Sequence, residues 1–313
     1  MIDSISQFID VIRAAGLKPP SDIVPGEIHR FPGAGKNTAN TAGWCILFDD
    51  GLGGSFGDLS TGLSENWFAK QEKTFNDIER AAFKRDVNRA QKLAAQKRLS
   101  KYDAAAAKAK KIWNLATPLE NDHPYIIKKC LNEFCIRLNN DMVVKQYNGD
   151  IVLPIYDFSD ELASLQFIKP DGSKRFLAGG RKRDCFIHTQ NDLLVSPDYF
   201  PLQVIICEGW ATGHTLACMN PYALVLVAID AGNLKSLALY VSERWDDTTL
   251  IIAGDDDRQT PGNPGATNAR AAALAYGALL SFPVWPADAP ESLTDFNDLH
   301  VWYYNESRKR SPF

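Results

Sequence analysis

The chain has 313 residues, of which 45% are hydrophobic and 11% aromatic. This length and composition suit two globular domains, or one large domain with an extension, and argue against a fibrous or wholly disordered protein. No run of about 18 apolar residues occurs and the first residues are acidic, so neither a membrane span nor a signal peptide is predicted. Six scattered cysteines without a Cys-x-x-Cys pair favour reduced thiols and a cytoplasmic location.

The first 68 residues predict a small module. Residues 3–16 have an Asp/Ser start signal and end at Gly16, a pattern typical of one short helix. Residues 21–68 hold short runs of aromatic and apolar residues separated by glycines, which predicts a β-rich set of hairpins. We therefore expect residues 1–68 to be a unit of one helix plus β structure.

Residues 69–117 predict a basic helical linker. Between Lys70 and Trp113 the chain has 13 Lys/Arg and 5 Asp/Glu, a local charge of +8, while glycine and proline are missing. This predicts one long helix or a helix pair. Its positive charge fits either a solvated face or a nucleic-acid contact, and both interpretations stay open. Pro118 and Pro124 mark the next boundary.

From about residue 136 the sequence alternates strands and helices. Strands are predicted at 150–157, 162–169 and 185–189, before buried strands at 204–207, 224–228 and 250–253 that alternate with helices. A last helix at 266–280 and a strand at 281–286 complete the prediction. This order indicates an α/β fold with a mainly parallel sheet covered by helices on both faces.

Acidic residues follow three of these strands. Glu208, Asp230 and the run Asp255–Asp257 stand just past strand ends, where open parallel sheets bind their ligands. In an extended segment Asp255 and Asp257 project to the same side, so they can share a cation such as Mg²⁺. Glu208 could complete this site or act as a general acid or base. For Asp230 a turn or helix cap is the better interpretation.

These residues also resemble a known family. The segments "VIICEGWATGHTL" and "LIIAGDDD", followed by "GATNARAAA", resemble the Toprim domain of bacterial-type primases, topoisomerases and some nucleases. The segments "HPYIIKKCL", "AIDAGNL" and "TDFNDLH" resemble, in order and spacing, the primases of phages, satellite phages and conjugative plasmids. The resemblance implies a primase-type N-terminal subdomain of the catalytic core at 118–200 and a Toprim domain at 201–313.

The resemblance assigns roles to individual residues. Glu208 matches the Toprim acid/base and possible metal contact, and Asp255 and Asp257 match its metal ligands. Asp295 and Asp298 match a further acidic motif that could reach the same metals. The basic residues expected to bind nucleotide or nucleic acid are Lys169, Lys174, Arg175, Arg181 and Lys182.

The implied activity is that of a DNA primase that uses Mg²⁺ or Mn²⁺ to join ribonucleotides on a single-stranded DNA template. Nucleoside triphosphates and a separate replicative helicase would be its partners, and no membrane is involved. No zinc is expected, because residues 21–68 contain only Cys45 and His29 as soft or imidazole ligands. Two alternatives stay open: a Toprim-type metal-dependent nuclease, and a non-catalytic replication adaptor that binds DNA or a helicase.

Overall fold

The computed structural model describes residues 2–69, 77–119, 122–131, 144–189 and 200–310. The chain divides into two compact units, Met1–Arg98 and Leu99–Phe313. No described helix is long and apolar enough to cross a membrane. The four-part division expected from the sequence, with boundaries at 68, 117 and 200, stays a prediction.

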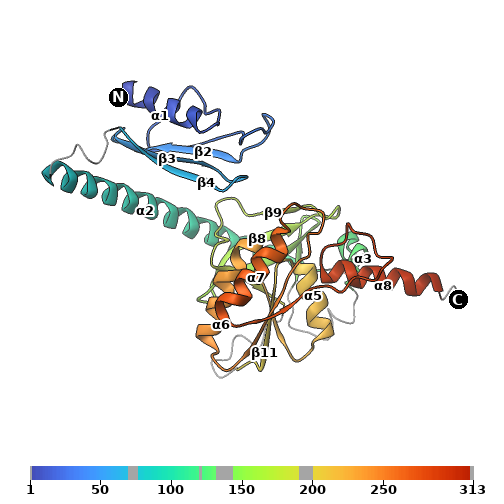
Figure 1. Cartoon of the computed structure of the whole chain (residues 1–313). Helices are drawn as coiled ribbons and strands as arrows, with labels where there is room; N and C mark the ends of the chain where they lie inside the picture. The colour runs from blue at the N-terminus through green and yellow to red at the C-terminus, as the bar shows by residue number, and fades with distance from the viewer. Residues whose placement is uncertain (1, 70–76, 120–121, 132–143, 190–199, 311–313) are drawn as a thin grey trace. The chain divides into compact units, whose positions relative to one another are not determined.

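The first unit contains a helix and a four-stranded antiparallel sheet (Figure 1). Apolar residues of helix α1 (Ile2–Ala14), including Phe8 and Ile12, share a core with Cys45 and Phe56 of the sheet. The sheet order is β1-β2-β3-β4, with β1 (Ile28–Phe31), β2 (Gly43–Leu47), β3 (Gly53–Asp58) and β4 (Leu63–Phe68). The predicted helix and β-rich module are confirmed. Burial raises the pKa of Cys45 to about 11, so this thiol stays protonated in the core.

One continuous helix, α2 (Asp77–Leu115), follows, and residues 70–76 of the predicted helix lie outside the described residues. Near its end, Ala105 and Ala109 are buried against Val152, Leu165 and Phe167. Small alanine side chains allow the helix to approach the sheet closely, while the basic side chains described on this helix are exposed. The linker helix is therefore anchored by alanine, not by its charges.

The second unit is built on a ten-stranded sheet with a path of β14-β13-β11-β12-β10-β7-β6-β5, plus β8 on β7 and β9 on β8. β11 (Gln203–Cys207), β12 (Leu224–Val227), β13 (Thr249–Ala253) and β14 (Leu279–Ser281) are parallel to one another. The remaining strands pair antiparallel, so the predicted mainly parallel sheet holds for the C-terminal part only. These strands are β5 (Thr117–Pro118), β6 (Lys145–Tyr147), β7 (Asp150–Asp157), β8 (Leu162–Ile168), β9 (Lys174–Phe176) and β10 (Cys185–His188).

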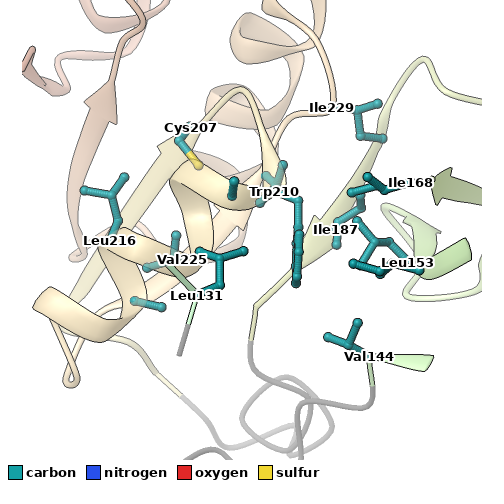
Figure 2. Close-up of a cluster of buried hydrophobic side chains, with 14 of the residues drawn as sticks. Leu131, Val144, Leu153, Ile168, Ile187, Cys207, Trp210, Leu216, Val225 and Ile229 are labelled. Carbon is teal, nitrogen blue, oxygen red and sulfur yellow. The ribbon is translucent and has the colours of Figure 1, made fainter. Parts of the chain in front are cut away.

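Helices cover both faces of the parallel part, which explains its unbroken apolar strands. Along β11, Ile205 and Cys207 join the core that contains Trp210 of α5 (Trp210–Met219). Figure 2 shows Cys207 and Trp210 in this cluster. The alternate residues Val204 and Ile206 join the core under α6 (Leu234–Arg244) and α7 (Pro264–Tyr276). The short α3 (Pro124–Lys128) and the long α8 (Phe296–Arg310) complete the unit.

Two predictions need correction. The helix predicted at 266–280 ends at Tyr276, because Gly277 adopts a left-handed conformation (φ 63°) that terminates it. The next strand is consequently β14 at 279–281 rather than 281–286. Cys218 is in a disulfide, whereas Cys45, Cys130, Cys185 and Cys207 are free thiols, so the prediction of six reduced cysteines is wrong for Cys218.

Candidate active site

The acidic residues lie at the carboxyl edge of the parallel strands. β11 pairs in register with β12 on one side and β13 on the other, so the ends of all three strands meet at one edge. Glu208 directly follows β11, and Asp255 follows β13 after Gly254. A Cβ atom on Gly254 would lie 2.6 Å from the Cβ of Ala269, so glycine lets α7 approach the strand end.

The carboxylates of this edge lie close enough for their charges to raise the pKa values of Glu208 and Asp255. Burial raises the pKa of Asp255 to about 8, and the charges of Glu208, Asp295 and Asp257 add to the rise. Burial also raises the pKa of Glu208, together with the charges of Asp257 and Asp230. Oδ1 of Asp255 is buried without a hydrogen-bond partner among the described residues. The structure thus brings the predicted residues Glu208, Asp255, Asp257 and Asp295 together.

The three consecutive aspartates have different environments. Asp257 accepts a hydrogen bond at Oδ2 from the backbone N–H of Gly265 in the first turn of α7 (3.0 Å). Asp256 turns away and accepts from Nδ2 of Asn263 (2.8 Å) and Nε1 of Trp285 (3.0 Å). Asp256 therefore anchors the loop. Asn263 in turn accepts from the backbone N–H of Asp257 (2.9 Å) and caps α7.

The second acidic motif lies at the start of α8. Asp295 accepts at Oδ1 from the backbone N–H of Asp298 (2.8 Å), which is the geometry of a helix cap. Asp298 accepts from the N–H of Thr294 at Oδ2 (3.1 Å) and from Nζ of Lys129 at Oδ1 (2.9 Å). Burial and the charge of Asp298 raise the pKa of Asp295. The charge of Asp295 therefore acts on the acidic cluster. Both carboxylate oxygens of Asp298 are already hydrogen-bonded, to Thr294 and Lys129.

One of the five predicted basic residues, Lys174, acts on the clustered acids, and a second, Lys182, lies near Asp230. The charge of Lys174 opposes the rise in pKa at both Glu208 and Asp255. Lys182 places Nζ 3.9 Å from Oδ2 of Asp230 and 4.5 Å from the ring centroid of Phe176.

The other three have different surroundings. Arg175 pairs with Asp150 (3.0 Å) and covers the ring of Phe167. Arg181 lies 3.6 Å from Asp157 and 3.8 Å from Asp184. Lys169 is exposed, in the turn closed by its backbone N–H to the carbonyl of Ser173 (2.9 Å).

Comparison with known proteins identifies this part of the chain. Residues 203–302 match the family model of the Toprim domain. This part of the chain is therefore similar to a Toprim domain. It is also 31% identical over 292 residues to a DNA primase TraC of Escherichia coli, with 89% of this chain and 26% of the relative covered. A second DNA primase TraC of Escherichia coli is 30% identical over 318 residues, with 94% of this chain and 21% of the relative covered.

The chain thus spans about a quarter of the length of the curated relatives it matches. Among solved structures, the primase fragment of the bacteriophage T7 primase-helicase protein aligns with a TM-score of 0.42 and 11% identity, covering 91% of this chain and 99% of that one. A DnaG primase catalytic domain bound to ssDNA aligns with a TM-score of 0.41 and 15% identity, covering 69% and 82%. The resemblance to Toprim-type primases found in the sequence is confirmed.

The donor atoms of the Toprim site suit a hard divalent cation. They are carboxylate oxygens, and the buried Oδ1 of Asp255 has no hydrogen-bond donor among the described residues. Among those same residues, no three His, Cys, Asp or Glu side chains already converge into a set that could hold a metal ion. A cation would therefore have to draw the neighbouring carboxylates together by side-chain rotation, and in doing so would offset their mutual repulsion.

The sequence predicted Asp298 but missed Lys129, Asn297 and Asn263, which support the acids. Lys129 and Asp298 are 169 positions apart and meet only through the packing of α3 and α8. Asn297 strengthens that junction by donating from Nδ2 to the carbonyl of Lys129 and to Oγ1 of Thr215, both at 2.9 Å. Asn263 carried a usable signal, because an asparagine before a proline at the start of a helix is a common cap.

Proposed function

We propose that this protein is a DNA primase, a nucleotidyltransferase that joins ribonucleotides on single-stranded DNA. The observation that carries the proposal is the cluster of Glu208, Asp255, Asp257 and Asp295 at the strand ends of the Toprim domain. Identity of 31% to a DNA primase over 89% of the chain supports this reaction over other Toprim activities. The chain matches only about a quarter of each relative, so the activity of the relatives cannot simply be transferred to it. We therefore base the proposal on the acidic residues of this chain.

Divalent ions, Mg²⁺ or Mn²⁺, would stabilise negative charge on the attacking and leaving oxygens of nucleotidyl transfer. Asp255 and Asp257, with Asp295 beside them, would hold these ions, and Asp298 would support Asp295 from its pairing with Lys129. No zinc is proposed.

Glu208 is placed to handle the proton of the reaction. Its burial and its acidic neighbours raise its pKa, so the carboxylate can accept the proton of an attacking 3′-hydroxyl more readily than an exposed glutamate. Lys174 would bind the anionic triphosphate, since its charge acts on both Glu208 and Asp255, and Lys182, which lies near Asp230, would assist it. The exposed Lys169 would contact nucleic acid directly, whereas Arg175 and Arg181 would first have to leave Asp150 and Asp157.

The proposed partners are a single-stranded DNA template, nucleoside triphosphates and a separate replicative helicase. A cytoplasmic location remains the expectation from the sequence.

The deciding experiment incubates the protein with single-stranded DNA, labelled ribonucleotides and Mn²⁺. New oligoribonucleotides that disappear in the variant Asp255→Asn/Asp257→Asn support the proposal. Asp246→Asn/Asp247→Asn is the matched control, because these two exposed aspartates precede the opposite end of β13.

Two outcomes would replace the proposal. Shortening of the DNA without new oligoribonucleotides would identify a nuclease. Full replication activity of Asp255→Asn/Asp257→Asn in cells would identify a non-catalytic adaptor.

A further inference from the structure

One side of α2 presents an exposed row of lysines within the second unit. Lys101, Lys108 and Lys111, which we call the lysine face, are all exposed. At about 100° of rotation per residue they fall within an arc of about 80°, and they span about 15 Å along the helix axis. The three lysines therefore form a continuous line of positive charge along one side of the helix.

The lysine face is not neutralised by acids. Among the described residues, none of its three lysines forms an ion pair or a hydrogen bond. Other basic side chains of the same unit are paired, for example Arg175 with Asp150 and Lys129 with Asp298. The neighbouring acid Asp103 projects from another side of the helix, where it lines a cavity of about 390 Å³ together with Arg181.

The lysine face is held on a fixed support. Ala105 and Ala109, on the adjacent arc of the helix, are buried against β7 and β8. The backbone that carries the lysines is therefore fixed relative to the sheet, and only the side chains remain free to move. Binding of a partner to the three lysines therefore costs little conformational entropy, because the helix backbone is already ordered.

Basic residues also connect this face to the acidic site. The loop 179–183 touches α2, because a Cβ on Gly179 would lie 4.0 Å from both the Lys101 carbonyl oxygen and the Ala105 Cβ. The same loop carries Lys182, which covers Phe176 at the end of β9. β9 begins with Lys174, the cation beside Glu208 and Asp255.

We propose that the lysine face of α2 binds the sugar–phosphate backbone of single-stranded DNA that leads to or from the acidic site. Lysines are point charges suited to phosphates, and the exposed arc from Lys101 to Lys111 carries no aromatic side chain for base stacking. The contact is therefore independent of base sequence. The identity of the strand as template rests on the proposed function.

The test measures how salt weakens binding of labelled single-stranded DNA, in EDTA and without nucleotides. Each phosphate contact contributes about 0.7 to the slope of log K against log salt, so Lys101→Gln/Lys108→Gln/Lys111→Gln should lower the slope by about 2 for an oligonucleotide of about 16 nucleotides. An oligonucleotide of about 4 nucleotides, which can occupy the acidic site alone, should bind both proteins alike. Circular dichroism confirms that the variant is folded.

The matched control is Arg85→Gln/Arg89→Gln/Lys92→Gln, which removes three exposed charges from an earlier part of the same helix. An unchanged slope in the lysine variant, an equal loss in the control, or an equal loss with the short oligonucleotide would overturn the inference. Catalysis plays no part in this measurement. If the salt slopes are as predicted but no primers are synthesised, the proposed function is wrong and the inference about the lysine face still holds.

Discussion

Neutralising Asp255 should make the protein more stable while abolishing its activity. Burial raises the pKa of Asp255 from 3.8 to about 8, aided by Glu208, Asp295 and Asp257. Its folded-state pKa thus exceeds its unfolded value, so its contribution to stability is fully present below about pH 4 and is lost as pH rises to about 8. A shift of about four pKa units corresponds to at most about 5 kcal/mol, of which Asp255→Asn should recover several at pH 8.

The assay is chemical denaturation of both proteins in EDTA at several pH values. Asp255→Asn should exceed the wild type in unfolding free energy at pH 8, and the difference should shrink towards pH 4, where the wild-type carboxyl is protonated. Mg²⁺ should then stabilise the wild type and leave the variant unchanged. The control Asp246→Asn/Asp247→Asn should show no comparable gain. Equal stability of Asp255→Asn and wild type at both pH values would refute the reasoning, because the carboxylate would then carry no burial cost.

Two further substitutions test the supports of the site. Asn263→Ala removes the cap of α7 and the partner of both Asp256 and the Asp257 N–H, so it should cost about 1–2 kcal/mol in unfolding free energy and weaken Mg²⁺ binding by calorimetry. Lys129→Gln leaves Asp298 without its cation and removes a charge that lowers the pKa of Asp295. Mg²⁺ binding by this variant should therefore weaken most below neutral pH, and a pH profile identical to wild type would contradict the role of this pair.

The parallel half of the fold could be predicted because its signals are local. β11, β12 and β13 are short apolar runs bounded by helical segments, and an acid after a strand end marks the ligand edge wherever such strands are parallel. The antiparallel half is different. The pairing of β10 with both β12 and β7 depends on contacts far apart in sequence, which no local pattern specifies. At Gly277 the signal was present, but the apolar residues beyond it continued the helical pattern.

The site residues divide in the same way. Alternation along an extended segment correctly separates Asp256 from its two neighbours. It does not predict that Trp285 and Asn263 donate hydrogen bonds to Asp256. For "Lys174-Arg175" alternation shows only that the two side chains point to opposite faces. Which of them faces the acids depends on how β9 pairs with β8, so the tertiary structure alone selects Lys174.

The three consecutive aspartates have different roles within one loop. A turn with only a structural role needs Asp256, which fixes the loop through Asn263 and Trp285, and Asp257, which binds the N-terminus of α7. Neither contact requires Asp255. Its buried Oδ1 has no hydrogen-bond partner among the described residues, and its negative charge is repelled by those of Glu208 and Asp295. A residue that costs stability and gains no contact in the fold is expected where its charge serves a ligand. The hydrogen bonds of this loop therefore account for Asp256 and Asp257 but not for Asp255, which is why we propose Asp255 as a cation ligand.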